Sequence, residues 1–170
     1  FINYDSPFAD KNFLDAIKES DSTKKNFFII DEAHNFINNL YNNIISKTGK
    51  RAFVIYDYIL KEKIESPDTM IVLMSGTPAI NNPFELALIF NLMRPGIFPN
   101  SELKFNEIYI KSNQLSNDMK NTFMRRIMGL VSYYSGADKQ LFAEKRVQFV
   151  YCKFHEKQQK TYEHFELIEK

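Results

Sequence analysis

Two adjacent carboxylates, Asp31 and Glu32, directly follow an apolar run at residues 27–30. Four β-prone residues in a row predict a buried strand, and such a strand delivers the residues after it to the carboxyl edge of a sheet. Ligands bind at that edge in open α/β sheets. There Asp31 could hold Mg²⁺, typically through a water, while Glu32 orients or deprotonates an attacking water. Phosphoryl transfer from a nucleotide needs this division of roles.

A second apolar run, residues 70–74, ends in Ser75, Gly76, Thr77 and a proline. Gly76 would let the backbone turn tightly at the strand end, and the two hydroxyls flank it. His34, in the first turn after the acids, could contact whichever segment crosses the top of the sheet. The alternative interpretations are an acid-rich helix start and a capped turn before a buried helix. Two strands that each end in a polar cluster favour a site over packing alone.

The elements that must position these residues follow from apolar periodicity. An asparagine, a proline and a glutamate at positions 82, 83 and 85 are typical of a helix start with a capping box. The order of elements predicts an α/β layered fold with a mainly parallel sheet. The expected elements are a helix through about residue 19, a strand at 27–30, helices from about 35 to 45 and at 51–64, a strand at 70–74 and a buried helix at 84–93.

The pattern changes character after about residue 100. We expect amphipathic helices around 102–111 and 117–130, a further strand at 146–154 and a helix at 155–168. The sequence therefore predicts three parts, at residues 1–99, 100–145 and 146–170.

Composition sets broad limits. The 170 residues are 44% hydrophobic, which is enough for a core, and the net charge of +1 hides no acidic or basic tail. A neutral total still allows a basic groove for nucleic acid. One cysteine excludes an internal disulfide framework and suits a reducing compartment. No apolar run approaches the roughly 20 residues that span a bilayer, so we expect no membrane partner. Since the amino terminus lacks an initiator Met and a targeting pattern, we expect the interior of a larger protein.

Taken together, the two polar clusters resemble the second and third motifs of superfamily 2 helicases and translocases, the DEAD/DEAH-box group. Residues 75–86, SGTPAINNPFEL, are similar to the Swi/Snf-type branch, in which a (T/S)GTP motif runs into N-N-x-x-E-L. Within that branch the chain is most similar to nucleoside triphosphatases and early-transcription-factor ATPases of large cytoplasmic DNA viruses such as poxviruses. The resemblance covers about residues 27–162 and is most specific over 27–99. Cellular remodellers are the alternative.

The resemblance implies a motor in which ATP and Mg²⁺ bind between two RecA-like lobes of the P-loop NTPase type, and hydrolysis drives movement on DNA or RNA, with DNA favoured. By matching position, Asp31 is the magnesium-side acid and Glu32 the catalytic base. The nucleotide and coupling residues are then His34, Ser75, Gly76 and Thr77.

The same resemblance assigns the three parts and the setting of the protein. Residues 1–99 correspond to the carboxyl-terminal half of the first lobe, 100–145 to a helical inter-lobe region and 146–170 to the start of the second lobe. Viral RNA polymerase or other transcription proteins are the implied partners. The expected location is intracellular: the host cytoplasm or the virion for a viral protein, with the nucleus as the alternative.

The chain also departs from the family pattern. It contains no G-x-x-x-x-G-K-S/T phosphate loop, and residues 47–51 hold similar letters in the wrong order, downstream of the acids. The arginine fingers that a second lobe would supply are absent as well. We therefore expect the chain alone to be inactive. Two alternatives stay open, a motor-like scaffold that binds nucleic acid or transcription proteins without hydrolysis and a plain nucleotide-binding domain, although residues 75–86 argue against the second.

Overall fold

The computed structural model describes residues 1–20, 25–47, 49–79, 81–112, 114–134, 136, 143 and 146–169. The chain divides into two compact units, Phe1–Ser132 and Tyr133–Lys170. All strands found among the described residues lie in the first unit, together with the six candidate site residues. Within the described ranges, no helix combines the length and the apolar character that crossing a membrane would require.

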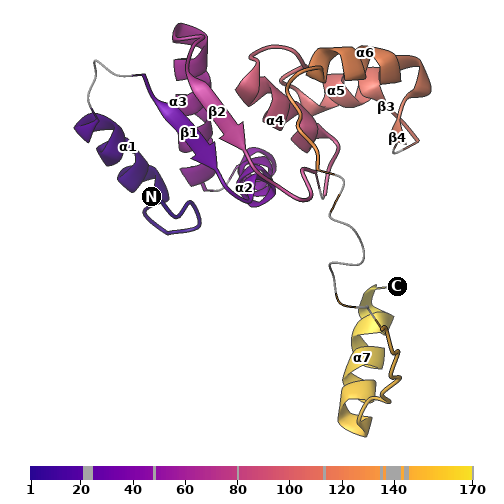
Figure 1. Cartoon of the computed structure of the whole chain (residues 1–170). Helices are drawn as coiled ribbons and strands as arrows, with labels where there is room; N and C mark the ends of the chain where they lie inside the picture. Colours follow the sequence, from indigo (N-terminus) through magenta and orange to yellow (C-terminus); the bar gives the residue numbers. More distant parts are fainter. Residues whose placement is uncertain are drawn as a thin grey trace. The chain divides into compact units, whose positions relative to one another are not determined.

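The first unit is built around a pair of parallel strands (Figure 1). Strand β1 runs beside β2 in register, from Phe27 opposite Met70 to Ile30 opposite Leu73. The two helices α2 and α3 lie between these strands in the chain, which is the crossover that parallel pairing requires. The predicted α/β class with a parallel sheet is confirmed. The elements up to this point are α1 (Ala9–Glu19), β1 (Phe27–Ile30), α2 (Ala33–Ser46), α3 (Arg51–Glu65) and β2 (Met70–Leu73).

The described residues cover only one face of this sheet. Phe28 packs toward the core, where the ring of Phe13 from α1 lies 6.2 Å from Phe28 and 5.4 Å from Tyr58 of α3. Residues on the opposite face stay exposed, so the expectation of a fully buried strand at 27–30 is wrong for every second residue. The exposed face is apolar and comprises Phe27, Ile29, Met70 and Val72, continued by Met74.

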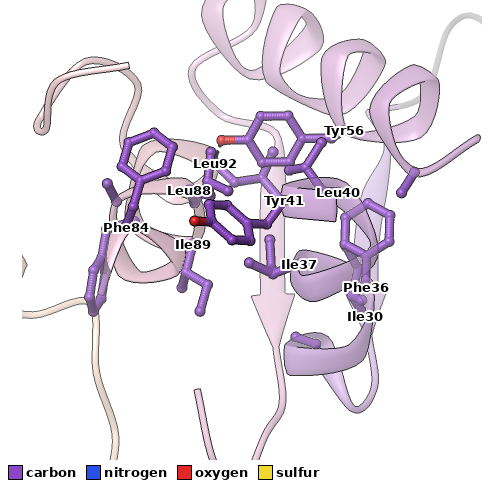
Figure 2. Packing of buried hydrophobic residues seen from close by; sticks show 14 of the residues in the cluster. Ile30, Phe36, Ile37, Leu40, Tyr41, Tyr56, Phe84, Leu88, Ile89 and Leu92 are labelled. Carbon is purple, nitrogen blue, oxygen red and sulfur yellow. Dashed lines mark hydrogen bonds between the residues drawn. The ribbon is translucent and has the colours of Figure 1, made fainter. Parts of the chain in front are cut away.

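Helix α4 (Phe84–Met93) forms the centre of the core together with α2. Figure 2 shows Leu88 and Leu92 of α4 packed among Ile37 and Leu40 of α2. The helix is apolar nearly all round, which explains why almost all of its residues are buried. Its first N–H, on Phe84, donates to Asn82 Oδ1 at 2.8 Å, as the predicted cap requires.

The segment after residue 100 differs in detail from the prediction. Helix α5 (Glu102–Tyr109) ends two residues early, because Ile110 adopts extended backbone with φ −112° and ψ 131°. A short antiparallel hairpin comes next, formed by β3 (Ile110–Lys111) and β4 (Gln114–Leu115). Ser112, with φ 52°, makes the turn. Helix α6 (Asn117–Ile127) also ends early, shortly before Gly129, which has a φ of +80°.

The second unit contains helix α7 (Glu156–Glu169), and the predicted helix at 155–168 is confirmed. The predicted strand at 146–154 is wrong: these residues adopt no regular structure and are exposed. A strand needs a partner for its backbone N–H and C=O groups, and no described strand pairs with this segment. The functional assignment of the three sequence ranges stays a prediction.

Candidate active site

The two polar clusters predicted from the sequence meet at one edge of the sheet. Because β1 and β2 are parallel and in register, the residues after them leave the sheet on the same side. Backbone hydrogen bonds continue past the strand ends, from Met74 N–H to Ile30 O and from Ala33 N–H to Met74 O, each at 2.9 Å. We call residues 31 and 32 the acidic turn, and residues 75–77 the hydroxyl loop.

The acidic turn has an unusual backbone. Glu32 has φ 47° and ψ 46°, a left-handed conformation that non-glycine residues rarely adopt. Its N–H donates to Asp31 Oδ1 at 2.9 Å, and its carbonyl accepts the N–H of Asn35 at 2.9 Å. The turn therefore leads straight into α2 at Ala33, two residues earlier than the apolar pattern from Asn35 indicates. Both acidic side chains are exposed at the sheet edge.

His34 connects the acidic turn to the hydroxyl loop. Its Nδ1 lies 2.9 Å from Ser75 Oγ and 3.2 Å from Glu32 Oε2. The His34 side chain is 15% exposed, whereas that of Glu32 is 60% exposed. A neutral ring that carries its hydrogen on Nδ1 can donate to either the carboxylate or the hydroxyl. This hydrogen points to one acceptor at a time, so the orientation of the ring decides whether His34 donates to Ser75 Oγ or to Glu32 Oε2.

The hydroxyl loop is exposed and lightly restrained. Thr77 N–H donates to Ser75 Oγ at 3.1 Å, a bond within the loop itself. Gly76 does not have a left-handed φ, and a Cβ added there would meet nothing within 4 Å. A left-handed backbone is therefore not what requires glycine here, and the role of Gly76 in the turn stays a prediction. Its lack of a side chain instead leaves open space above the loop.

Downstream of the hydroxyl loop, two asparagines attach the chain to α2. Asn81 Nδ2 donates to Asn38 Oδ1 at 2.9 Å. Asn82 Nδ2 donates to the Tyr41 hydroxyl and, at 2.7 Å, to Glu102 Oε1, which also accepts the Tyr41 hydroxyl at 2.9 Å. Burial and the neighbouring Glu102 carboxylate raise the pKa of Tyr41 to about 12. The sequence pattern indicates Asn82 only as a helix cap and does not reveal its bonds to α2 and α5.

Tyr4 is a further residue that the sequence does not single out. Its hydroxyl lies 3.2 Å from the carbonyl oxygen of Asp31 and 3.1 Å from that of Glu32. No motif or spacing marks Tyr4, because the contact joins residues 27 positions apart in the chain.

The exposed carboxylates at this edge are compatible with a magnesium site. Among the described residues, no group of three or more His, Cys, Asp or Glu side chains could hold a metal. Magnesium needs no such group, since it usually binds one or two carboxylates together with phosphate oxygens and waters. Asp31 suits this role because its exposed carboxylate is oriented through Oδ1 by the Glu32 N–H.

Comparison with known proteins identifies the family. Residues 12–170 match the SNF2-related domain. The chain belongs to this family. Two mimivirus proteins (Acanthamoeba polyphaga mimivirus) are similar to it. One, named "Putative ATP-dependent RNA helicase R350", is 55% identical over 172 residues, covering 99% of this chain and 21% of that protein. The other, "Putative ATP-dependent RNA helicase R563", is 30% identical over 168 residues, covering 94% of this chain and 27% of that protein.

These matches confirm the predicted resemblance to the Swi/Snf-type branch of superfamily 2 and to proteins of large DNA viruses. The family is one of helicase-like ATPases, and the small parallel sheet is part of a RecA-like lobe. The chain spans between about a fifth and just over a quarter of the length of these two relatives, at 21% and 27%.

Proposed function

We propose that this chain is part of the motor core of a nucleic-acid-dependent ATPase, which hydrolyses ATP with Mg²⁺ to move on or remodel DNA or RNA. One observation carries the proposal: in a chain of the SNF2-related family, the acidic turn and the hydroxyl loop lie at one sheet edge, joined through His34.

The two acids would divide the chemistry between them. Asp31 would hold the magnesium ion, typically through a water, and Glu32 would orient the attacking water and accept its proton. The exposed Glu32 carboxylate is accessible to water, while its contact with His34 Nδ1 restrains it. Magnesium, when bound with the nucleotide, offsets the negative charge that develops on the phosphate oxygens.

His34, Ser75, Gly76 and Thr77 couple the nucleotide to movement in this proposal. Any displacement of the hydroxyl loop changes the distance between Ser75 Oγ and His34 Nδ1, which is 2.9 Å here. When this bond lengthens, the His34 ring can rotate so that Nδ1–H donates to Glu32 instead. Contact of another part of the protein with the hydroxyl loop would thus move Ser75, and His34 would transmit this displacement to Glu32, the proposed catalytic base.

The substrate we propose is DNA, in line with the Swi/Snf-type resemblance, although both relatives carry the name RNA helicase. Transcription proteins, including a viral RNA polymerase, are the proposed partners, in the host cytoplasm or the virion. Stimulation of ATP hydrolysis by duplex DNA, single-stranded DNA and RNA, measured side by side, tests the choice. Stronger stimulation by RNA would reverse it.

The central test is Glu32→Gln in the natural polypeptide that contains this chain. Loss of the general base should lower ATP hydrolysis about 100-fold or more, while binding of a fluorescent ATP analogue stays near the parent level. Phosphate release measures the first and fluorescence titration the second. Glu107→Gln, which changes an exposed carboxylate on α5, is the matched control. Near-normal turnover of Glu32→Gln would overturn the assignment, and a parent that binds ATP without hydrolysis would favour the scaffold.

A further inference from the structure

We propose that Tyr4 is a positioning residue, which holds the backbone of the acidic turn in the geometry that hydrolysis requires. The proposal rests on the proposed roles of Asp31 and Glu32. Its basis is the placement of one hydroxyl within hydrogen-bond distance of two consecutive carbonyls, at 3.2 Å from Asp31 O and 3.1 Å from Glu32 O.

The acidic turn is a place where such a restraint matters. The left-handed backbone of Glu32 is unfavourable for a residue with a Cβ, so it persists only where surrounding contacts enforce it. Backbone bonds enforce it from one side, through Ala33 N–H to Met74 O and Asn35 N–H to Glu32 O. Among the described residues, Tyr4 is the one whose side chain bonds these two carbonyls. Loss of its hydroxyl would let the peptide between the two acids rotate, and the carboxylates would move with it.

Tyr4 itself is well anchored. Its ring packs edge-on against Phe36 of α2, with ring centres 5.7 Å apart and planes at 64°. The next residue, Asp5, accepts a hydrogen bond from the Asn39 side chain of α2 at 2.9 Å. Tyr4 and the acidic turn that it contacts are therefore both attached to α2.

The hydroxyl of Tyr4 is the hydrogen-bond donor in both contacts with the acidic turn. Tyr4 acts on the backbone of the turn and not on the nucleotide, which distinguishes it from the two acids.

The test is Tyr4→Phe in the natural polypeptide that contains this chain. The variant keeps the ring contact with Phe36 and removes only the hydroxyl. Because one hydrogen bond of this kind is lost, kcat for ATP hydrolysis should fall about three- to tenfold, with KM for ATP unchanged. Amide hydrogen exchange at residues 33–35 should be faster than in the parent, while exchange in β2 stays the same.

Tyr56→Phe is the matched control. The Tyr56 hydroxyl also donates to a backbone carbonyl, that of Leu88 at 2.8 Å, but it does so in the core away from the acids. This variant should lower the thermal unfolding midpoint and leave kcat unchanged. If the two variants affect stability and kcat alike, Tyr4 is structural and the proposal is overturned.

The outcomes separate this inference from the proposed function. If Glu32→Gln is inactive while Tyr4→Phe keeps the parent kcat, the role of Tyr4 alone is refuted. If the parent protein does not hydrolyse ATP, the proposed function fails. Hydrogen exchange then tests whether Tyr4 holds the acidic turn: an unchanged exchange rate at residues 33–35 in Tyr4→Phe refutes this role.

Discussion

The acidic turn and the hydroxyl loop lie at the same sheet edge but are restrained to different degrees. Tyr4, Met74 and Asn35 all hydrogen-bond the backbone at or next to the acidic turn. In the hydroxyl loop, the Ser75 hydroxyl contacts His34 and accepts one bond from within the loop, and the space around Gly76 is open. The backbone that carries the groups proposed for chemistry is thus held by hydrogen bonds from three residues, whereas the described contacts of the loop proposed for coupling are fewer.

This division has a physical rationale. A catalytic carboxylate that is already oriented costs no reorganisation at the moment of reaction. A loop that completes the site only when another part of the protein arrives must instead be free to change position. Single substitutions in the acidic turn and in the hydroxyl loop test this contrast.

Alongside Glu32→Gln, the largest effect is expected for Asp31→Asn. The amide oxygen can still accept the Glu32 N–H, which preserves the turn, but the negative charge for magnesium is lost. ATP hydrolysis in the natural polypeptide should fall by about 100-fold, because a bound metal contributes several kcal/mol to the transition state. Phosphate release measured against Mg²⁺ concentration should also show a higher requirement for the ion. An unchanged Mg²⁺ dependence would contradict the assignment of Asp31.

A smaller effect is expected for the link between the two loops. His34→Ala and Ser75→Ala should each lower ATP hydrolysis about three- to tenfold, since both remove the His34–Ser75 hydrogen bond. His34→Ala also removes the contact with Glu32, and Ser75→Ala removes the bond from Thr77 N–H. The double variant should be less damaging than two independent losses, because the His34–Ser75 bond is lost in both single variants. Ser66→Ala, in the turn between α3 and β2, serves as the control. Fully additive losses would show that His34 and Ser75 act separately.

The hydrogen bonds that join Tyr41, Asn82 and Glu102 should affect stability more than activity. Tyr41→Phe removes a bond to Glu102 and should lower the free energy of unfolding by about 1 kcal/mol at neutral pH. Because the folded pKa is raised to about 12, the Tyr41 contribution is complete below about pH 10, the ordinary value for tyrosine. It is lost as the pH rises toward the folded pKa.

Urea unfolding at pH 8 and near pH 11 measures this dependence. The gap in stability between the parent and Tyr41→Phe should narrow at the higher pH. Burial also raises the pKa of Tyr56, but that residue is present in both proteins and cancels in the comparison. A gap that widens with pH would contradict the sign of the Tyr41 shift.

The smallest effect on stability is expected for Gly76→Ala. An added methyl group meets no atom and no backbone strain, so the free energy of unfolding should change by less than about 0.5 kcal/mol. Gly49→Ala is the contrasting variant, since Gly49 has φ +73° and an added Cβ would lie 2.9 Å from Asn43 Nδ2. It should destabilise by about 1 kcal/mol or more. A large loss in Gly76→Ala would refute the open hydroxyl loop.

How far the sequence predicts this structure depends on the range of each interaction. Strands β1 and β2 and helix α4 follow from local patterns, which are apolar runs and a capping residue, Asn82. The placement of Asp31 and Ser75 at one sheet edge follows from one further rule, that parallel strands end at the same edge. The hydrogen bonds from Tyr4 to the acidic turn and from Asn81 to Asn38 cannot be predicted from the sequence. They join residues far apart in the chain through side chains without a recognisable pattern.

The hairpin β3–β4 is not predicted from the sequence, for a different reason. Ile110 continues the apolar periodicity of α5, so pattern alone extends the helix through it. The fold instead gives Ile110 a partner in Leu115, and two short paired strands satisfy backbone groups that one more helical turn would also have satisfied. Where two local structures satisfy the backbone equally well, tertiary packing decides between them.

The uncovered face of the β1–β2 sheet affects how the protein is handled in the laboratory. Parallel sheets are normally covered on both faces, and an exposed apolar patch promotes association. Met70 and Met74 lie on that face, 62% and 44% exposed. Thioethers in such positions are oxidised readily to sulfoxides. Mild peroxide treatment followed by mass spectrometry therefore turns these two methionines into reporters: rapid oxidation marks a bare sheet, and slow oxidation in a longer polypeptide marks one that its neighbouring elements have covered.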